Sequence, residues 1–197
     1  MKPLFLGSHP AIDFLNTTLA PRGETIELIG DGRSFLEWLA GAGLLDPAAV
    51  PRLLRRFSGA ALDGAAAEAR RFRTWVRAWI ASWQQAPDGD HQGELRRLNA
   101  LLEREAVHRE LVATPHGREV VERSRIDSAD QLIGLVAVQV AQLVAREDPS
   151  LIKPCAGSEC TLWFLDRTKA GRRLFCSAAA CGNRAKVAAF RERQRTG

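Results

Sequence analysis

Four cysteines lie in the last quarter of the chain, and the first 154 residues contain none. They form two pairs, Cys155 with Cys160 and Cys176 with Cys181; four residues separate the members of each pair and fifteen separate the pairs. Two short cysteine pairs at such a separation are typical of a tetrahedral zinc site with four thiolate ligands. We therefore predict that these cysteines bind Zn²⁺. The alternative is four reduced cysteines that hold no metal.

The N-terminal sequence indicates whether the protein is exported, and therefore whether these cysteines form disulfides. MKPLFLGSHPAIDF lacks the long apolar run and the cleavage site of a secretory signal. Disulfides are rare in proteins that are not exported, so clustered cysteines favour a metal over cross-links. No apolar run approaches the roughly 20 residues that span a bilayer. We expect a cytoplasmic protein with no membrane partner.

Charge divides the sequence into two parts. Residues 151–197 contain ten Lys and Arg against three Asp and Glu, whereas residues 1–150 contain 18 against 20. The basic pI of about 9.5 therefore comes from the C-terminal part. A concentration of positive charge favours a polyanionic partner, and here we expect DNA. The alternative is a basic tail that only keeps the protein soluble.

The residues around the cysteines predict a small module. Leu162–Leu165 and Arg173–Phe175 suit two short strands joined by a turn at Thr168–Gly171, and Cys181 would lie near the first turn of a final helix. The first cysteine pair would form a zinc knuckle. A knuckle followed by a hairpin and a helix is the order of elements in a treble-clef zinc finger. A module of this size buries little surface, so zinc would supply folding free energy on the order of 10 kcal/mol. Its core is predicted to consist of Trp163, Phe164, Leu174 and Phe175.

The final helix has an apolar stripe with basic residues on both sides. At about 100° per residue, Asn183, Val187 and Phe190 share one stripe, which we expect to pack on the hairpin. We expect Asn183 to fix the start of this helix more than to contact a base. The predicted nucleic-acid contacts are two hairpin arginines and the basic residues of the helix: Arg172, Arg173, Arg184, Lys186, Arg191, Arg193 and Arg195.

The first 149 residues are predicted to form a helical bundle. Apolar residues at helical spacing, with capping residues before them, predict a series of helices and one β-hairpin. The fold class expected is mainly α (α+β), with domains at 1–149 and 150–197. The stripe of Trp75, Trp79 and Trp83 is assigned to the core or to a dimer interface. The expected helices are Ser8–Thr17, Ser34–Leu45, Asp46–Phe57, Leu62–Gln85, Asp90–Ala106 and Ala129–Arg146, and the hairpin is His108–Ser124.

A polar row marks the first helix. His9, Asp13 and Asn16 recur at i, i+4 and i+7 and would share one face, and Arg22 follows in a loop. One interpretation is a pocket for a small-molecule effector. The other is a hydrogen-bond network in which Asp13 fixes His9 or Arg22. A nucleophile and a base cannot be paired here, so we do not expect an enzyme.

Several motifs together resemble a known family. The first cysteine pair, WFLDRTKAGRRLFCS and the run ACGNRAKV resemble the CGNR-type zinc finger, and GSHPAIDFLNT with Arg22 and FLEWLAGAGLL is similar to the ABATE domain that precedes this finger in bacterial proteins. Phe175 stands where such fingers often have Trp, which should not alter metal binding. The resemblance implies a stress-induced transcription regulator that binds Zn²⁺ through its four cysteines and DNA through the finger. The N-terminal domain would sense a small ligand or form a homodimer. The alternative is a small-molecule-binding or adaptor protein whose finger is structural, or binds protein or RNA.

Overall fold

The structure is a computed structural model that describes residues 5–20 and 23–196. In this part of the chain it is mainly helical with three two-stranded antiparallel sheets, which confirms the mainly α class with some β. No described helix is long and apolar enough to cross a membrane. Among the predicted site residues, Arg22 lies outside the described residues.

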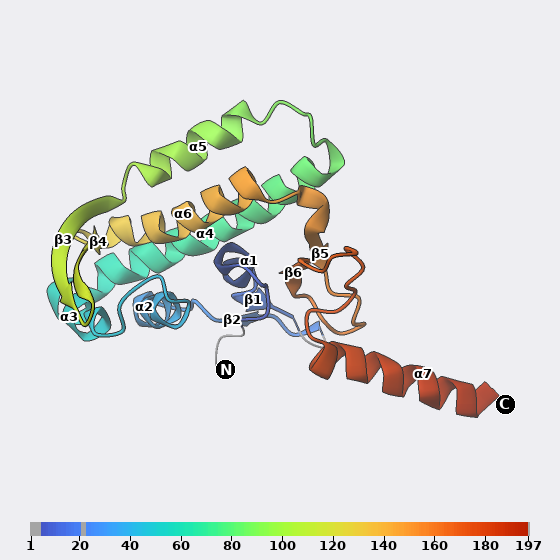
Figure 1. The fold of residues 1–197 in the computed structure, drawn as a ribbon. Coiled ribbons are helices and arrows are strands. Elements are labelled where there is room, and N and C mark those ends of the chain that lie inside the picture. Colours follow the sequence, from blue (N-terminus) through green and yellow to red (C-terminus); the bar gives the residue numbers. More distant parts are fainter. Residues whose placement is uncertain (1–4, 21–22, 197) are drawn as a thin grey trace.

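Two long helices form the centre of the molecule (Figure 1). They are α4 (Gly59–Gln85) and α6 (Leu132–Arg146), which lie side by side. The helix α5 (Gln92–Leu102) packs on α6, and α2 (Gly32–Gly41) packs on α4. The short helix α1 (Pro10–Leu15) contacts both α4 and α6. α6 was expected in the centre because it is apolar on most faces, and its buried residues confirm this: Leu132, Ile133, Gly134, Leu135, Val136, Ala137, Val140 and Leu143.

Aromatic side chains connect these helices. Phe14 of α1 lies 5.6 Å from Trp38 of α2 and 5.9 Å from Phe72 of α4, measured between ring centroids. Trp79 is buried, and Trp75 and Trp83 are half-buried against the same core. The tryptophan stripe of α4 therefore contributes to the core of this chain.

The helix ends follow local capping chemistry. Asp31 caps α2 as predicted, because its carboxylate accepts the Ser34 N–H in a capping box, and Gly43 follows the helix with φ of +72°. His9 rather than Ser8 caps α1, since Ser8 has φ of +64° and lies outside the helix. α3 (Ala49–Arg56) begins later than expected, because Asp46 closes a turn on the Ala48 N–H instead.

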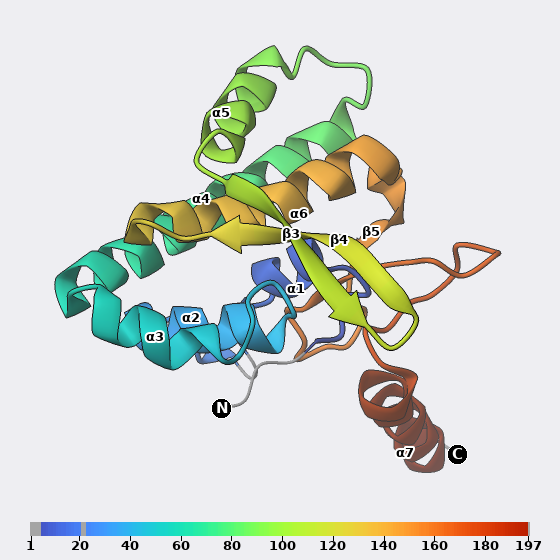
Figure 2. The same ribbon diagram turned by 60° about the vertical axis from the view of Figure 1, so that its left-hand side comes forward.

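The predicted hairpin is present and forms a ribbon of β3 (Ala106–Thr114) and β4 (Gly117–Arg125). It lies at one end of the helical body, on the left in Figure 1, and comes to the front in Figure 2. Its strands are longer than expected and close across a two-residue loop between Thr114 and Gly117. Most of its side chains are exposed, including Leu111 at 66% and Val120 at 64%.

The C-terminal part folds differently from the predicted hairpin. η3 (Pro149–Leu151) leads into β5 (Ile152–Pro154), and β6 (Trp163–Leu165) pairs with β5 rather than with residues 173–175. The predicted second strand was wrong, because Asp166 turns the chain by accepting from Thr168 and from the Arg173 N–H. Another short sheet joins β1 (Thr18–Leu19) and β2 (Ile26–Glu27).

The predicted miniature core is only partly correct. Phe164 is buried and Phe175 packs against the cluster that contains the cysteines, but Leu174 is 62% exposed. Trp163 packs against the main helical core. Trp163 and Leu165 of β6 thus join the C-terminal module to the helical body, whereas Phe164 belongs to the small cluster around the cysteines.

Candidate metal centre and nucleic-acid interface

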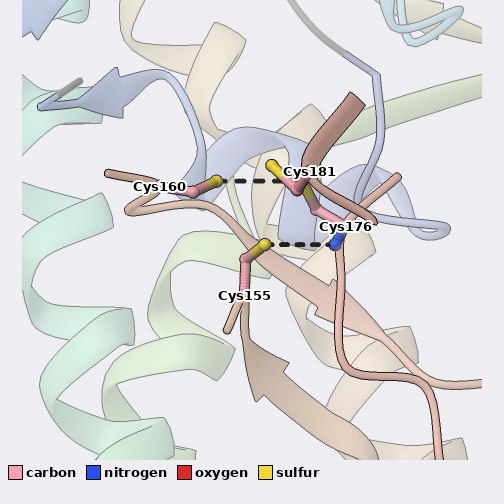
Figure 3. A group of neighbouring side chains, drawn as sticks. All are labelled: Cys155, Cys160, Cys176 and Cys181. Atoms are coloured by element: carbon pink, nitrogen blue, oxygen red, sulfur yellow. Dashed lines mark hydrogen bonds between the residues drawn. The ribbon is translucent and has the colours of Figure 1, made fainter. Parts of the chain in front are cut away.

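The four cysteines converge although they come from three separate segments (Figure 3). Cys155 and Cys160 lie in the loop between β5 and β6, and Cys176 lies in the segment between β6 and η4 (Ala178–Gly182). Cys181 lies in η4 itself, a single π-helical turn that leads into α7 (Asn183–Thr196). The four sulfur atoms all lie within 4.8 Å of one another. This arrangement is a metal-binding cluster of four cysteines, as the spacing predicted.

The cluster has the dimensions of a tetrathiolate site. Cys176 Sγ lies 3.8 Å from Cys160 Sγ and 3.7 Å from Cys181 Sγ. A tetrahedron with metal–sulfur bonds of about 2.3 Å has edges of about 3.8 Å, so these separations fit zinc. Three of the four cysteines are buried and Cys160 is half-buried. The donor set therefore suits a structural site with no open coordination position.

Because the four thiols are largely buried and close together, they can all be in the thiolate form only when a cation is bound. Burial raises the pKa of the Cys160 thiol to about 11, and burial together with the charge of Cys160 raises the pKa of Cys176 further. Four thiolates this close repel one another unless a cation lies among them. A divalent metal would supply that charge and hold all four in the thiolate form.

Polar groups of the chain also contact the sulfurs. Arg184 Nη2 lies 3.0 Å from Cys181 Sγ, and the Cys176 N–H donates to Cys155 Sγ at 3.3 Å. The hydrogen bond to Cys181 raises the pKa of Arg184. Donors of this kind orient thiolate ligands and partly balance their charge. Arg184, predicted to contact a phosphate, thus has one guanidinium nitrogen beside the metal centre.

α7 leaves the rest of the molecule as a projecting helix, as both ribbon views show (Figures 1 and 2). The prediction that its apolar stripe packs on the finger was wrong, since Asn183 is exposed and Val187 and Phe190 are 49% and 55% exposed. The chain before the helix turns at η4 and directs α7 outward. Its apolar stripe is therefore available to a partner.

The basic side chains of α7 lie on both sides of this stripe. Lys186 and Arg191 are exposed, and so are Arg193 and Arg195, the latter 3.7 Å from Glu192. Arg172 lies exposed in the loop after β6, together with Lys169. Sequence reasoning did not single out Lys169, although it belongs to the turn predicted between the cysteine pairs. The projecting helix and this loop present cations from one small module.

Comparison with protein families gives two matches. The model described as "ABATE: Putative stress-induced transcription regulator" matches residues 8–147, and the model described as "CGNR zinc finger" matches residues 152–194. The first match spans 140 of 197 residues, counted from 8 to 147. The chain belongs to the ABATE family. A comparison with curated proteins gives no match.

In this ABATE protein, Arg173 is used inside the finger. Its Nε donates to the Phe175 carbonyl at 2.8 Å, and its guanidinium lies 4.4 Å from the centroid of the Phe164 ring. Its other nitrogens contact the Cys176 carbonyl and Ser8 Oγ. The side chain predicted to contact DNA therefore holds the segment that leads into Cys176, and we assign its main role to positioning that cysteine.

The polar row of the ABATE domain is engaged within the molecule. The His9 ring accepts the Ala11 N–H, and Asp13 Oδ1 accepts the Gly7 N–H at 2.7 Å. Asn16 is buried and bonds to the backbone of Trp163 in the finger. These three side chains bond to three different backbone partners: Asp13 accepts from Gly7 rather than from His9, and its other predicted partner, Arg22, lies outside the described residues. The effector pocket itself stays a prediction.

The CGNR finger is fixed to the ABATE domain along one edge of β6. The Leu165 N–H donates to the Gly7 carbonyl at 2.8 Å, next to the two bonds between Asn16 and Trp163. Arg77 of α4 lies 5.3 Å from the centroid of the Trp163 ring. The helix that begins the ABATE motif thus pairs with the finger, a contact that the sequence pattern did not indicate.

Proposed function

We propose that this ABATE protein is a DNA-binding transcription regulator that contacts the duplex through α7 and the loop after β6. The proposal keeps Zn²⁺ as the metal of the four cysteines and assigns it a structural role. The metal would fix η4, and η4 sets the direction in which α7 leaves the module. In this account the chain has no catalytic role and acts in the cytoplasm.

The exposed surface of α7 is the observation that carries the proposal. The helix contains five Lys and Arg against one Glu, and Val187 and Phe190 of its apolar stripe are exposed among the described residues. Positive rows on both sides of a helix suit the phosphates that border a DNA groove. The stripe between them is suited to apolar contact with thymine methyl groups.

Arginines within the finger have separate roles in this proposal. Arg173 positions Cys176. One nitrogen of the Arg184 guanidinium contacts Cys181, and the rest of this side chain faces solvent. Lys186, Arg191, Arg193 and Arg195 would contact phosphates from α7, with Arg172 and Lys169 contributing from the loop. A helix that makes this few contacts gives modest specificity alone, so a dimer or a second contact would be required for a defined operator.

Titration of the intact, zinc-loaded chain with duplex DNA at several salt concentrations tests the proposal. We expect log K to fall linearly with log salt, with a slope of about −0.9 for each phosphate neutralised. A preference for single-stranded RNA would favour the adaptor alternative. Absence of binding by the metal-loaded chain would make the finger a structural module.

A role for the ABATE domain in sensing is kept as a secondary proposal. The hydrogen bonds of Asn16 and Gly7 tie α1 to β6, so a ligand that moved α1 would also move the finger. This route supplies a physical connection between the two parts. It would be tested by comparing DNA affinity before and after addition of candidate small molecules, with the Asn16→Ala variant as a control that lacks the connection.

A further inference from the structure

We propose that β4 is a homodimerisation edge, at which two copies of this chain join their ribbons into a four-stranded antiparallel sheet. The inference concerns the hairpin and is independent of whether the finger binds DNA. The fold contains a long two-stranded ribbon at one end of the helical body (Figure 2). Two-stranded ribbons are marginally stable alone, and a third and fourth strand would stabilise this one.

In the part of the chain that the structure describes, β4 pairs with β3 alone, and its outer edge has no neighbouring strand. The ladder closes on Thr114 and Gly117, so these residues form a hydrogen-bonded pair and alternate residues of β4 direct their N–H and C=O groups away from β3. Those residues are Arg118, Val120, Glu122 and Ser124, and all four are exposed. β4 contains no proline, which could not donate to a new ladder, and its charged residues are of both signs, so they can pair with a second copy.

The charges of β4 are arranged so that two antiparallel copies of this strand attract each other. If two copies pair antiparallel about Val121, each Glu119 lies opposite Arg123 of the other copy, so two ion pairs of opposite charge form. Val120 and Glu122 would then exchange backbone hydrogen bonds across the junction. This interface has two-fold symmetry and closes on two copies.

Two other registers of β4 are opposed by like charges. Pairing centred on Glu119 would place that carboxylate opposite its own copy, and centring on Arg123 would do the same for two guanidinium groups. On β3, pairing centred on Glu110 juxtaposes two carboxylates, and centring on His108 or Val112 forms no pair of opposite charges. Pairing centred on Val120 also forms two pairs of opposite charge, between Arg118 and Glu122. The charges therefore select the outer edge of β4 with two registers, and cross-linking separates the register about Val121 from the one about Val120.

A symmetric disulfide tests the register directly. Val121 would lie opposite its own copy in a non-hydrogen-bonded pair, where Cα atoms are about 4.5 Å apart and a disulfide can form. We expect Val121→Cys in the zinc-loaded chain to form a covalent dimer rapidly when an oxidant is added. Val112→Cys is the matched control, because it is a half-buried valine of β3 that would lie far from the two-fold axis. Equal cross-linking of the two variants would overturn the proposal.

Charge exchange tests the same register without cross-linking. Glu119→Arg and Arg123→Glu should each raise the dimer dissociation constant by about tenfold, because each variant replaces two attractions by two repulsions. The double variant should restore dimerisation, since it exchanges the partners of both pairs. Light scattering over a concentration series measures all four proteins. A wild-type chain that is monomeric throughout the series, or a dimer unaffected by either single substitution, would contradict the inference.

Discussion

Asn16 and Trp163 are 147 residues apart in the sequence, yet the side-chain amide of Asn16 satisfies both backbone groups of Trp163. Its Nδ2 donates to the Trp163 carbonyl and its Oδ1 accepts the Trp163 N–H, each at 2.8 Å. The amide thereby takes the place of a neighbouring strand on the free edge of β6. This pair of bonds fixes the orientation of the finger on the first helix.

Asn16→Ala should therefore lower the stability of the joined structure. The substitution leaves two backbone groups without partners, and we expect a loss of about 2–4 kcal/mol in the free energy of unfolding. Urea unfolding measures the loss, and faster hydrogen exchange at Trp163 and Leu165 would locate it. Asn99→Ala on the exposed side of α5 is the matched control and should change stability little. Equal effects of the two substitutions would contradict this role of Asn16.

Removal of the metal should unfold the finger and leave most of the helical body. A site of this kind contributes folding free energy on the order of 10 kcal/mol, and the finger has few apolar residues to replace it. Treatment with a chelator, or the Cys176→Ser variant, should open residues 155–181 to protease while most helical circular dichroism remains. Elemental analysis should give one zinc for each wild-type chain. A finger that stays protected after the zinc is removed would show that the metal is not required.

Substitutions of Arg184 and Arg191 should have different effects on metal binding. Arg184 donates to a sulfur ligand, so Arg184→Ala should weaken zinc affinity by about tenfold or more. Arg191 has no contact with the cysteines in the described structure, and Arg191→Ala should leave zinc affinity unchanged. Competition with a chromophoric chelator measures both variants. Equal zinc affinities for the two variants would remove Arg184 from the metal centre.

Asp13 should give the stability a specific pH dependence. Burial raises the pKa of this carboxyl to about 6 in the folded chain, above its ordinary value of 3.8. The folded state therefore binds the proton more tightly, and the stabilisation that results is present below pH 4 and is lost as the pH rises through 6.

The Asp13→Asn variant isolates this dependence. Stability of the variant relative to wild type should rise by about 1 kcal/mol between pH 5 and pH 8, since only the wild-type side chain must carry a buried charge at pH 8. Chemical unfolding of both proteins at each pH provides the values. A difference that does not change with pH would show that Asp13 titrates normally in the folded chain.

The elements with strong local signals could be predicted from the sequence. α2 and α4 have caps at Asp31 and Ser58 and regular apolar spacing, so their ends lie within a few residues of the expected positions. The cysteine spacing likewise predicted the metal cluster, because four ligands of one ion must lie next to one another wherever they are in the sequence. In these places local chemistry and tertiary structure agree.

Predictions that depended on tertiary partners were less accurate. Residues 173–175 have strand-like composition, but β6 pairs with β5, and Asp166 and Arg173 hold the intervening loop instead. The stripe at Val187 and Phe190 is typical of a packed helix face, and nothing in its spacing shows that α7 points outward. Asn16 likewise gives no local sign that its partner lies at Trp163.

The measurement that tests the central claim most directly is the salt dependence of duplex binding by a Lys186→Ala, Arg191→Ala double variant. Both residues are exposed on α7, and the account predicts weaker binding with a log–log slope smaller by about two than that of the wild type. An Arg71→Ala, Arg96→Ala variant removes the same charge from exposed sites on the helical body and should retain the wild-type slope. Equal slopes for the wild type and both variants, with zinc bound in each, would contradict DNA binding through α7.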